Sequence, residues 1–258
     1  MLVIRAEQMD TFKKAALLSF EDEMVAHLAK FSPPLYKTVG EEQMRKAVQL
    51  GINQAAKYGF TYRGPVRLYL ELTLLFGSYF DTDPQYPWAT EILINQDAGT
   101  QMQRAERIYE ITMDYREKVA GPEDDYTLKA LKNIAIFAQQ PFTISFDNYI
   151  PVMLREIAQI YPQKAIYVGA AGLEALIRKG MGGAQRQQFA TVRGMALVTL
   201  LMLTLGHGCG GDPLYPWIAR TLNDDVITDP KVKSERLEKK ALTWLEHVMA
   251  YFDKREET

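Results

Sequence analysis

One six-residue motif occurs twice in this chain, at a separation equal to half of its 258 residues. Residues 83–88 read Asp-Pro-Gln-Tyr-Pro-Trp, residues 212–217 read Asp-Pro-Leu-Tyr-Pro-Trp, and 212 − 83 = 129. The same offset, without a gap, pairs Met24 with Met153, Pro33 with Pro162, Gly40 with Gly169, Gly51 with Gly180, Phe60 with Phe189, Gly77 with Gly206 and Glu106 with Glu235. Because matching prolines, glycines and apolar residues over such a length indicate a repeated structural unit, we predict a tandem duplication. Its halves are residues 1–125 and 126–258, joined by a polar, turn-rich stretch around Gly121 and Pro122.

Both halves are predicted to be helical, because apolar residues return at intervals of three and four and do not alternate over the length of a strand. We expect helices over 12–31, 41–58, 65–76 and 101–119 in the first half, and over 126–137, 148–161, 170–189, 191–205 and 232–252 in the second. A glycine inside a helix costs about 1 kcal/mol relative to alanine, so Gly51 and Gly180 predict a close approach between helices. The fold class is therefore all-α, with two units of four to five helices packed into one pseudo-symmetric domain.

The third helix of each half differs in polarity. Over 65–76, Arg67 and Glu71 lie four residues apart and can form an ion pair on one face. The matched segment 191–205 is almost uniformly apolar, so we expect it to be the more central helix.

Composition argues against several classes of function. The net charge is −2 and the isoelectric point is near 6.0, so no general attraction to nucleic acid or anionic lipid is expected. The longest apolar stretch, residues 195–205, is about half of what a membrane-crossing helix needs, so we predict no membrane insertion. Residues 1–10 carry acidic side chains early and lack the pattern of a secretion signal, so we expect a cytoplasmic protein. The single cysteine, Cys209, excludes an internal disulfide bond and fits a reducing compartment.

The repeated motif favours a fixed loop. Its first proline sets a turn, its second can begin a short helix, and its aspartate can accept hydrogen bonds from the amides of the turn. Two interpretations follow: the aromatic residues lock the loop against the helices, or they form an exposed surface that contacts a partner. The residues predicted for partner contact are Tyr79, Phe80, Asp83, Tyr86, Trp88, Tyr215 and Trp217. The first copy has the more polar flanks, so its residues are expected to be the more exposed ones.

Just before the motif the two copies differ, and a new role could arise there. The first copy reads Gly-Ser-Tyr-Phe-Asp-Thr over 77–82, and the second reads Gly-His-Gly-Cys-Gly-Gly over 206–211. His207 and Cys209, with Asp212 nearby, could form an activated thiolate, whereas a buried Cys209 would pack as a small apolar group. Neither this trio nor Asp81 with Asp83 has the spacing of a compact metal site, so no metal is predicted. The chain lacks a phosphate loop, a dinucleotide motif and a nucleophile elbow, so no catalytic residue and no cofactor are predicted.

Further short segments carry a family resemblance. They are Ile4-Arg5-x-x-Gln8-Met9, Phe20-Glu-Asp-x-Met-Val-x-His-Leu28, Gly51-Ile, Tyr58-Gly59, Leu75-Phe-Gly77, Phe80-Asp-x-Asp-Pro84 and Pro87-Trp88. With them the chain resembles a group of bacterial proteins encoded beside spike, PAAR and effector genes of type VI secretion systems. The resemblance covers most of the first half and the Gly-Asp-Pro-x-Tyr-Pro-Trp stretch of the second. Its motifs carry no assigned chemistry, so it implies a setting and no catalytic residue.

Three hypotheses of function follow. The first is a non-enzymatic accessory protein in the cytoplasm that binds a secreted effector or spike protein of the same locus, as an adaptor or chaperone or as an immunity protein. The second is an enzyme or toxin with a site around His207, Cys209 and Asp212. The third is a helical scaffold that associates with itself into a homo-oligomer. We prefer the first, because it agrees with the resemblance and with the lack of a catalytic constellation in the sequence.

Overall fold

The computed structural model describes residues 6–140, 145–186 and 191–256, and over these ranges it consists of helices and turns without a strand. The first half contains α1 (Ala6–Phe31), α2 (Pro33–Lys57), α3 (Arg63–Phe76), the 3-10 turn η1 (Phe80–Thr82), α4 (Pro87–Ile94), the 3-10 turn η2 (Gln96–Ala98) and α5 (Gln101–Tyr115). A π-helical turn, η3 (Arg116–Ala120), and a 3-10 turn, η4 (Pro122–Asp124), follow. The second half contains α6 (Asp125–Gln139), η5 (Phe146–Asn148), α7 (Tyr149–Ile160), α8 (Pro162–Arg186), α9 (Val192–Leu205), η6 (Cys209–Gly211), α10 (Pro216–Leu222) and α11 (Pro230–Glu256). The predicted all-α class is confirmed for the described residues.

Element bounds in the two halves follow the offset found in the sequence. α2 and α8 begin 129 positions apart (162 − 33 = 129), and α3 with α9 and η1 with η6 begin and end at the same separation. A proline starts α2 and α8, because the first residue of a helix needs no amide hydrogen, so both helices begin eight residues before the predicted starts (41 − 33 = 8 and 170 − 162 = 8). Both helices bend at a matched glycine, Gly40 and Gly169, with φ angles of 78° and 75°. Glycine adopts this conformation at little steric cost.

The two interior glycines lie where helices approach closely, as predicted. A Cβ atom on Gly51 would lie 2.5 Å from Leu70 Cδ2, and one on Gly180 would lie 2.4 Å from Thr199 Oγ1. Leu70 and Thr199 are also 129 positions apart (199 − 70 = 129), so both halves make the same contact between their second and third helices. Since protein interiors are close-packed, a Cβ atom at Gly51 would force the Leu70 side chain to move, and one at Gly180 would also press on the backbone of α9 at Thr199.

α9 is more deeply buried than α3, as its composition predicts. Buried residues number 10 of 14 in α9 and 7 of 14 in α3. Arg67 and Glu71 form the predicted ion pair on α3, with Arg67 Nε 2.9 Å from Glu71 Oε1. The matched residues of α9 are Ala196 and Leu200, both buried. Among the described residues, no helix is both long enough and apolar enough to cross a bilayer, and this includes α9.

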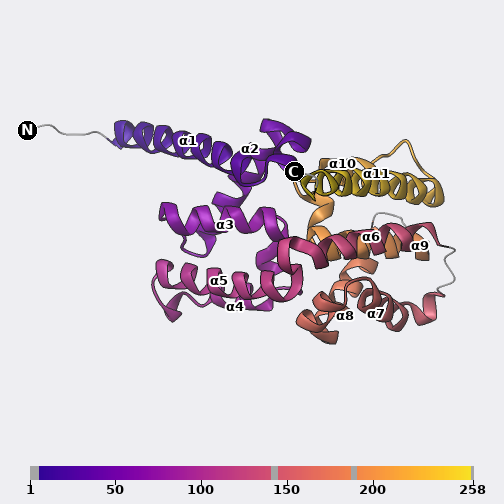
Figure 1. Cartoon of the computed structure of the whole chain (residues 1–258). Helices are drawn as coiled ribbons and strands as arrows, with labels where there is room; N and C mark the ends of the chain where they lie inside the picture. Colours follow the sequence, from indigo (N-terminus) through magenta and orange to yellow (C-terminus); the bar gives the residue numbers. More distant parts are fainter. Residues whose placement is uncertain (1–5, 141–144, 187–190, 257–258) are drawn as a thin grey trace, which may run out of the picture.

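The two halves lie side by side, each with its third helix between two layers (Figure 1). α3 lies between the α1–α2 layer and the α4–α5 layer, and α9 lies between the α7–α8 layer and the α10–α11 layer. The order of the layers is inverted, so α1 and α2 lie on the same side of the molecule as α10 and α11. Buried apolar residues from both halves form one core.

The halves differ at their starts. In the second half, α6 packs against α11 and in front of α9, and the chain then returns as α7 (Figure 1). In the first half, α1 is one straight helix that projects from the body, and its residues 8–19 are exposed on every side. The helix predicted over 170–189 is described as far as Arg186, while Phe189, Ile4 and Arg5 lie outside the described residues.

Candidate functional site

The halves meet at a pair of glycines that follow α3 and α9. Gly77 and Gly206 have φ angles of 92° and 88°, a conformation that residues with a Cβ atom rarely adopt. A Cβ atom on Gly77 would lie 2.4 Å from the carbonyl oxygen of Leu205, and one on Gly206 would lie 2.4 Å from that of Phe76. The contact is therefore reciprocal, and glycine at both positions allows the two backbones to cross.

Each copy of the motif uses its aspartate to bind the other half. The Asp212 carboxylate accepts hydrogen bonds from the backbone amide (2.8 Å) and the hydroxyl (2.7 Å) of Ser78. Asp83 Oδ2 accepts a hydrogen bond from the backbone amide of His207 (2.7 Å). Each carboxylate also accepts one from the amide two residues later in its own turn, at 2.9 Å in both copies. Because buried carboxylates require such partners, the two aspartates fix the junction between the halves.

The two junction aspartates differ in their electrostatic surroundings. Burial raises the pKa of Asp212 above its usual value, and the hydrogen bonds from Ser78 offset this effect only in part. Burial acts on Asp83 in the same direction, but the hydrogen bonds from His207 and from the Gln85 backbone amide, together with the charge of His207, outweigh it and leave the pKa of Asp83 below its usual value. His207 Nδ1 lies 3.3 Å from Asp83 Oδ2, and Nε2 lies 3.4 Å from Thr82 Oγ1. The histidine therefore belongs to the junction.

Most of the residues predicted for partner contact lie inside the protein. Phe80, Asp83, Tyr86 and Tyr215 are buried, whereas Tyr79, Trp88 and Trp217 are half-buried. The Phe80 ring packs on Tyr69, and the Trp88 ring packs edge-on against Phe76. The expected exposure of Phe80, Asp83 and Tyr86 is therefore wrong, because these side chains fill the space between the loop and α3. Partner contact stays a prediction for Tyr79, Trp88 and Trp217, which reach the surface in part.

The surroundings of Cys209 oppose an activated thiolate. Cys209 is 3% exposed, and burial raises the pKa of its thiol, with the charges of Asp212 and Asp83 acting in the same direction. The nitrogens of His207 lie close to Asp83 and Thr82. No three His, Cys, Asp or Glu side chains come together as a metal site within the described ranges. At this position Cys209 has the properties of a small apolar group.

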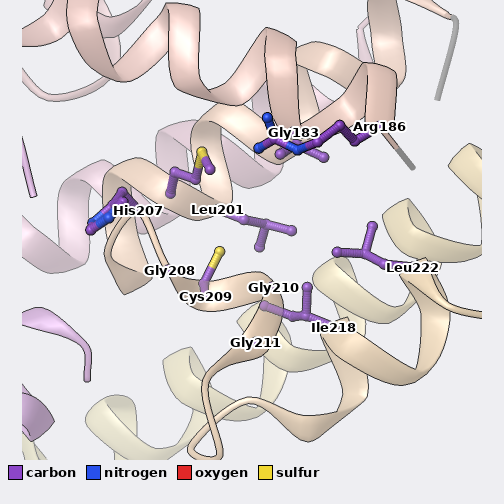
Figure 2. A pocket seen from close by; sticks show the side chains of 12 residues that line it. Gly183, Arg186, Leu201, His207, Gly208, Cys209, Gly210, Gly211, Ile218 and Leu222 are labelled. Carbon is purple, nitrogen blue, oxygen red and sulfur yellow. The ribbon is translucent and has the colours of Figure 1, made fainter. Parts of the chain in front are cut away.

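A cavity of about 220 Å³ lies beside Cys209 (Figure 2). Its walls come from the C-terminal end of α8, from α9, from the glycine-rich loop that contains η6, and from α10. Arg186 and Gly183 lie on one side of the opening, and Cys209 and Ile218 lie on the other. The lining is largely apolar, with Arg186 as its positive charge.

A second candidate site is an exposed apolar surface on the first half. Four large apolar side chains of α1, α3 and α5 are exposed there, and we call them the open face: Phe31, Leu75, Tyr109 and Met113. The matched positions of the second half are buried or half-buried: Ile160, Thr204, Glu238 and Leu242. Ile134 and Ala138 of α6 lie against α9 and α11, and Asn133 Nδ2 donates a hydrogen bond to the Ile160 carbonyl oxygen (3.0 Å). α6 thus covers the face that stays uncovered in the first half, where α1 runs straight.

Lys164 is a buried charge that the sequence analysis did not single out. Its side chain is 3% exposed, and Nζ donates hydrogen bonds to the Leu203 carbonyl oxygen and to the Tyr86 hydroxyl. Burial lowers the pKa of Lys164 to about 8, and the charge of Asp83 acts in the opposite direction. The lysine therefore joins α8 to α9 and to the first copy of the motif. The offset contained a signal for it, because the matched residue of the first half is Leu35.

The described residues thus form two halves with matched helix starts, an uncovered apolar face on the first half and a cavity open to the surface on the second. Comparison with protein-family models, with curated proteins and with solved structures gave no match.

Proposed function

We propose that this chain is a non-enzymatic accessory protein that binds a helical segment of another protein at its open face. The partner is a secreted effector or spike component from the same type VI secretion locus, the setting that the sequence resemblance implies. Binding in the cytoplasm would serve either loading, as an adaptor or chaperone, or neutralisation, as an immunity protein. The observation that carries the proposal is the exposure of Leu75 (40%), Tyr109 (53%) and Met113 (45%) on two packed helices. Clustered exposed apolar side chains of this kind mark interaction sites.

α6 indicates which kind of segment fits the open face. It is an amphipathic helix that buries Ala130, Leu131, Ile134 and Ala138, a stripe at helical spacing. The open face is built on α3 and α5, which hold the same order and offset as α9 and α11. We therefore expect the partner to supply an amphipathic helix with small and branched apolar residues at intervals of three and four.

The test is capture of each effector and spike protein of the same locus by the purified chain, with the mass of the complex measured in solution. Tyr109→Glu/Met113→Glu places two charges on the open face and should weaken binding at least about tenfold. Both side chains are exposed, so the variant should keep its fold. Ile136→Glu, on the exposed side of α6 (56%), is the matched control and should bind like the unmodified chain.

Two outcomes would contradict this proposal. Capture of a locus protein that survives Tyr109→Glu/Met113→Glu places the contact elsewhere, and Tyr79→Ala/Trp88→Ala then tests the predicted aromatic contacts. A homodimer that dissociates on Tyr109→Glu/Met113→Glu and also on Phe12→Glu would identify a second copy as the occupant. In that case the exposed part of α1, which carries Phe12 (62% exposed), supplies the helix and the chain is a self-associating scaffold.

We further infer that the architecture arose by tandem duplication of a helical unit, with halves over residues 1–125 and 126–258. Three observations support this: the matched bounds of α2 with α8 and α3 with α9, the matched bends at Gly40 and Gly169, and the reciprocal crossing at Gly77 and Gly206. A pseudo-symmetric domain would follow directly from such an origin.

Catalysis around His207, Cys209 and Asp212 is the less favoured alternative, because burial raises the pKa of the Cys209 thiol and His207 lies against Asp83. A small thiol-alkylating reagent separates the two cases. An activated Cys209 would react quickly at neutral pH, whereas the buried thiol should react slowly until the protein unfolds.

A further inference from the structure

The cavity beside Cys209 has a filled counterpart in the first half. The residues 129 positions before Val198, Cys209 and Gly210 are Tyr69, Phe80 and Asp81. The Tyr69 and Phe80 side chains are 1% and 0% exposed, and their ring centroids lie 4.8 Å apart. Two aromatic rings therefore occupy, in one half, the space that is open in the other.

The elements around this space have the same bounds in both halves, and the side chains that they carry differ. α3 and α9 have matched bounds, as do η1 and η6, and Gly77 and Gly206 have nearly equal φ angles. Valine and cysteine stand where the first half has tyrosine and phenylalanine, on elements with the same bounds. Because protein interiors are close-packed, two such replacements leave a void that the surrounding helices have not closed.

The polar groups of the cavity are the side chains of Arg186 and His207 and the backbone of the glycine-rich loop. Val198, Met202, Ile218 and Leu222 supply apolar walls, and the glycines of the η6 loop leave the backbone accessible. Arg186 lies at the rim on an exposed turn of α8, and no carboxylate pairs with its guanidinium in the described part of the chain. The nitrogens of His207, the other polar side chain of the lining, lie close to Asp83 and Thr82. A largely apolar slot with the unpaired Arg186 at its edge fits an aromatic ring that carries an acidic group.

We propose that this cavity binds a small aromatic carboxylate, whose ring takes the place that the Phe80 ring has in the first half and whose carboxylate contacts Arg186. The site lies in the second half, away from the open face, and does not depend on the proposed partner.

The test uses benzoate, benzyl alcohol and acetate as probes, with binding followed by ligand-observed NMR on the full chain. Benzoate should bind saturably with a dissociation constant below about 1 mM, and benzyl alcohol more weakly, because both contain the ring. Acetate carries the charge without the ring and should not bind. Arg186→Gln should weaken benzoate binding about tenfold and leave benzyl alcohol binding unchanged.

A variant that copies the first half gives the sharpest control. Cys209→Phe fills the cavity with the ring found at the matched position, so it should abolish binding of both aromatic probes while the protein stays folded and its Tm is unchanged or higher. Phe80→Cys makes the reverse change and should lower the Tm, because it opens a void in a filled core. If Cys209→Phe does not fold, Val198→Phe fills the same space from α9 and is read in the same way.

The proposal is overturned if neither aromatic probe binds saturably, or if binding persists in a folded Cys209→Phe or Val198→Phe protein. It is also overturned if both filling variants unfold, because the cavity would then be too small to hold a ring. Loss of effector capture in Tyr109→Glu/Met113→Glu leaves these readouts unaffected, so the cavity and the open face are tested separately.

Discussion

From α2 and α8 onward, the α-helices of the two halves begin 129 positions apart, but the halves leave space in different places. In the first half, Tyr69 and Phe80 fill the region beside the motif loop, and the face on α3 and α5 is uncovered. In the second half, α6 covers the matched face, and the small residues Val198 and Cys209 leave a cavity of about 220 Å³. The junction glycines and aspartates are the same in both. Matched glycines and aspartates thus join the two halves at one junction, while different side chains at matched positions leave an uncovered face on the first half and a cavity on the second.

We expect the largest loss of stability from substitutions at the two glycines where the halves cross. Gly77→Ala adds a Cβ atom 2.4 Å from the Leu205 carbonyl oxygen and forces alanine into a φ of 92°. Clash and backbone strain together should lower the free energy of unfolding by about 3 to 5 kcal/mol. Gly206→Ala should cost a similar amount, because the contact is reciprocal. Urea denaturation followed by circular dichroism measures both variants.

Gly40→Ala is the control that separates strain from clash. Gly40 also has a positive φ, 78°, but a Cβ atom there would have no heavy atom within 4 Å. Its substitution should cost only the strain, about 1 to 3 kcal/mol. Equal losses for Gly40→Ala and Gly77→Ala would mean that the crossing tolerates a methyl group and does not set the distance between the halves.

Substitution of either junction aspartate should cost less stability than the glycine substitutions. The costs at Asp83 and Asp212 should depend on pH in opposite directions. Asp83→Asn should lower the free energy of unfolding by about 2 kcal/mol at neutral pH, because it removes an acceptor from buried backbone amides. Asp212→Asn should cost less at neutral pH, because folding disfavours the ionised form of Asp212. The pKa of folded Asp83 lies below its ordinary value of 3.8, so its stabilisation is complete above that pH and is lost as pH falls through the folded pKa. The pKa of folded Asp212 lies above 3.8, so its contribution is complete below 3.8 and is lost as pH rises through the folded pKa.

The measurement is urea denaturation of both variants between pH 3 and about pH 6, which gives the free energy of unfolding at each pH. The cost of Asp83→Asn should shrink toward low pH, and the cost of Asp212→Asn should grow. His207→Ser copies Ser78 of the first half, so it should make Asp83 follow the pattern of Asp212. Parallel profiles for the two aspartates would show that His207 does not set the difference between them.

Much of the fold could be predicted from the sequence because it depends on local and periodic signals. The three- and four-residue spacing placed most helix ends within a few residues, but α2 and α8 begin at Pro33 and Pro162, eight residues before the predicted starts at 41 and 170. Gly51 and Gly180 marked a real close approach, since an interior glycine is unfavourable unless packing requires it. The π-helical turn Arg116–Ala120 was not predicted and shortened the helix expected over 101–119, because its hydrogen bonds leave no periodic trace in the sequence.

The candidate site was harder to predict, because it depends on contacts across more than a hundred residues. The motif was interpreted as a possible exposed surface, yet Asp83 and Asp212 bind each other's halves, a pairing that no local pattern reveals. The open face was missed because exposure of Tyr109 and Met113 depends on where α1 goes, and α1 has the same amphipathic pattern whether it folds back or projects. The cavity could have been predicted, because the offset pairs Cys209 with Phe80 and Val198 with Tyr69, and in both pairs the second half has the smaller side chain.

We expect the smallest loss of stability at the polar edge of α3, where Arg67 pairs with Glu71. Substitution of Arg67 tests whether polar contacts stabilise the uncovered open face. Arg67 is 54% exposed at its side chain and pairs with Glu71, which also contacts His27 Nε2 at 2.7 Å. Arg67→Ala copies Ala196 of α9, and exposed pairs of this kind contribute about 0.3 to 0.5 kcal/mol, so the free energy of unfolding should change by less than about 0.5 kcal/mol. A loss above about 1 kcal/mol would mean that Arg67, Glu71 and His27 act as a network. α3 would then rely on polar contacts at its edge where α9 relies on the cover of α6, and the open face would be stabilised for exposure in its own right.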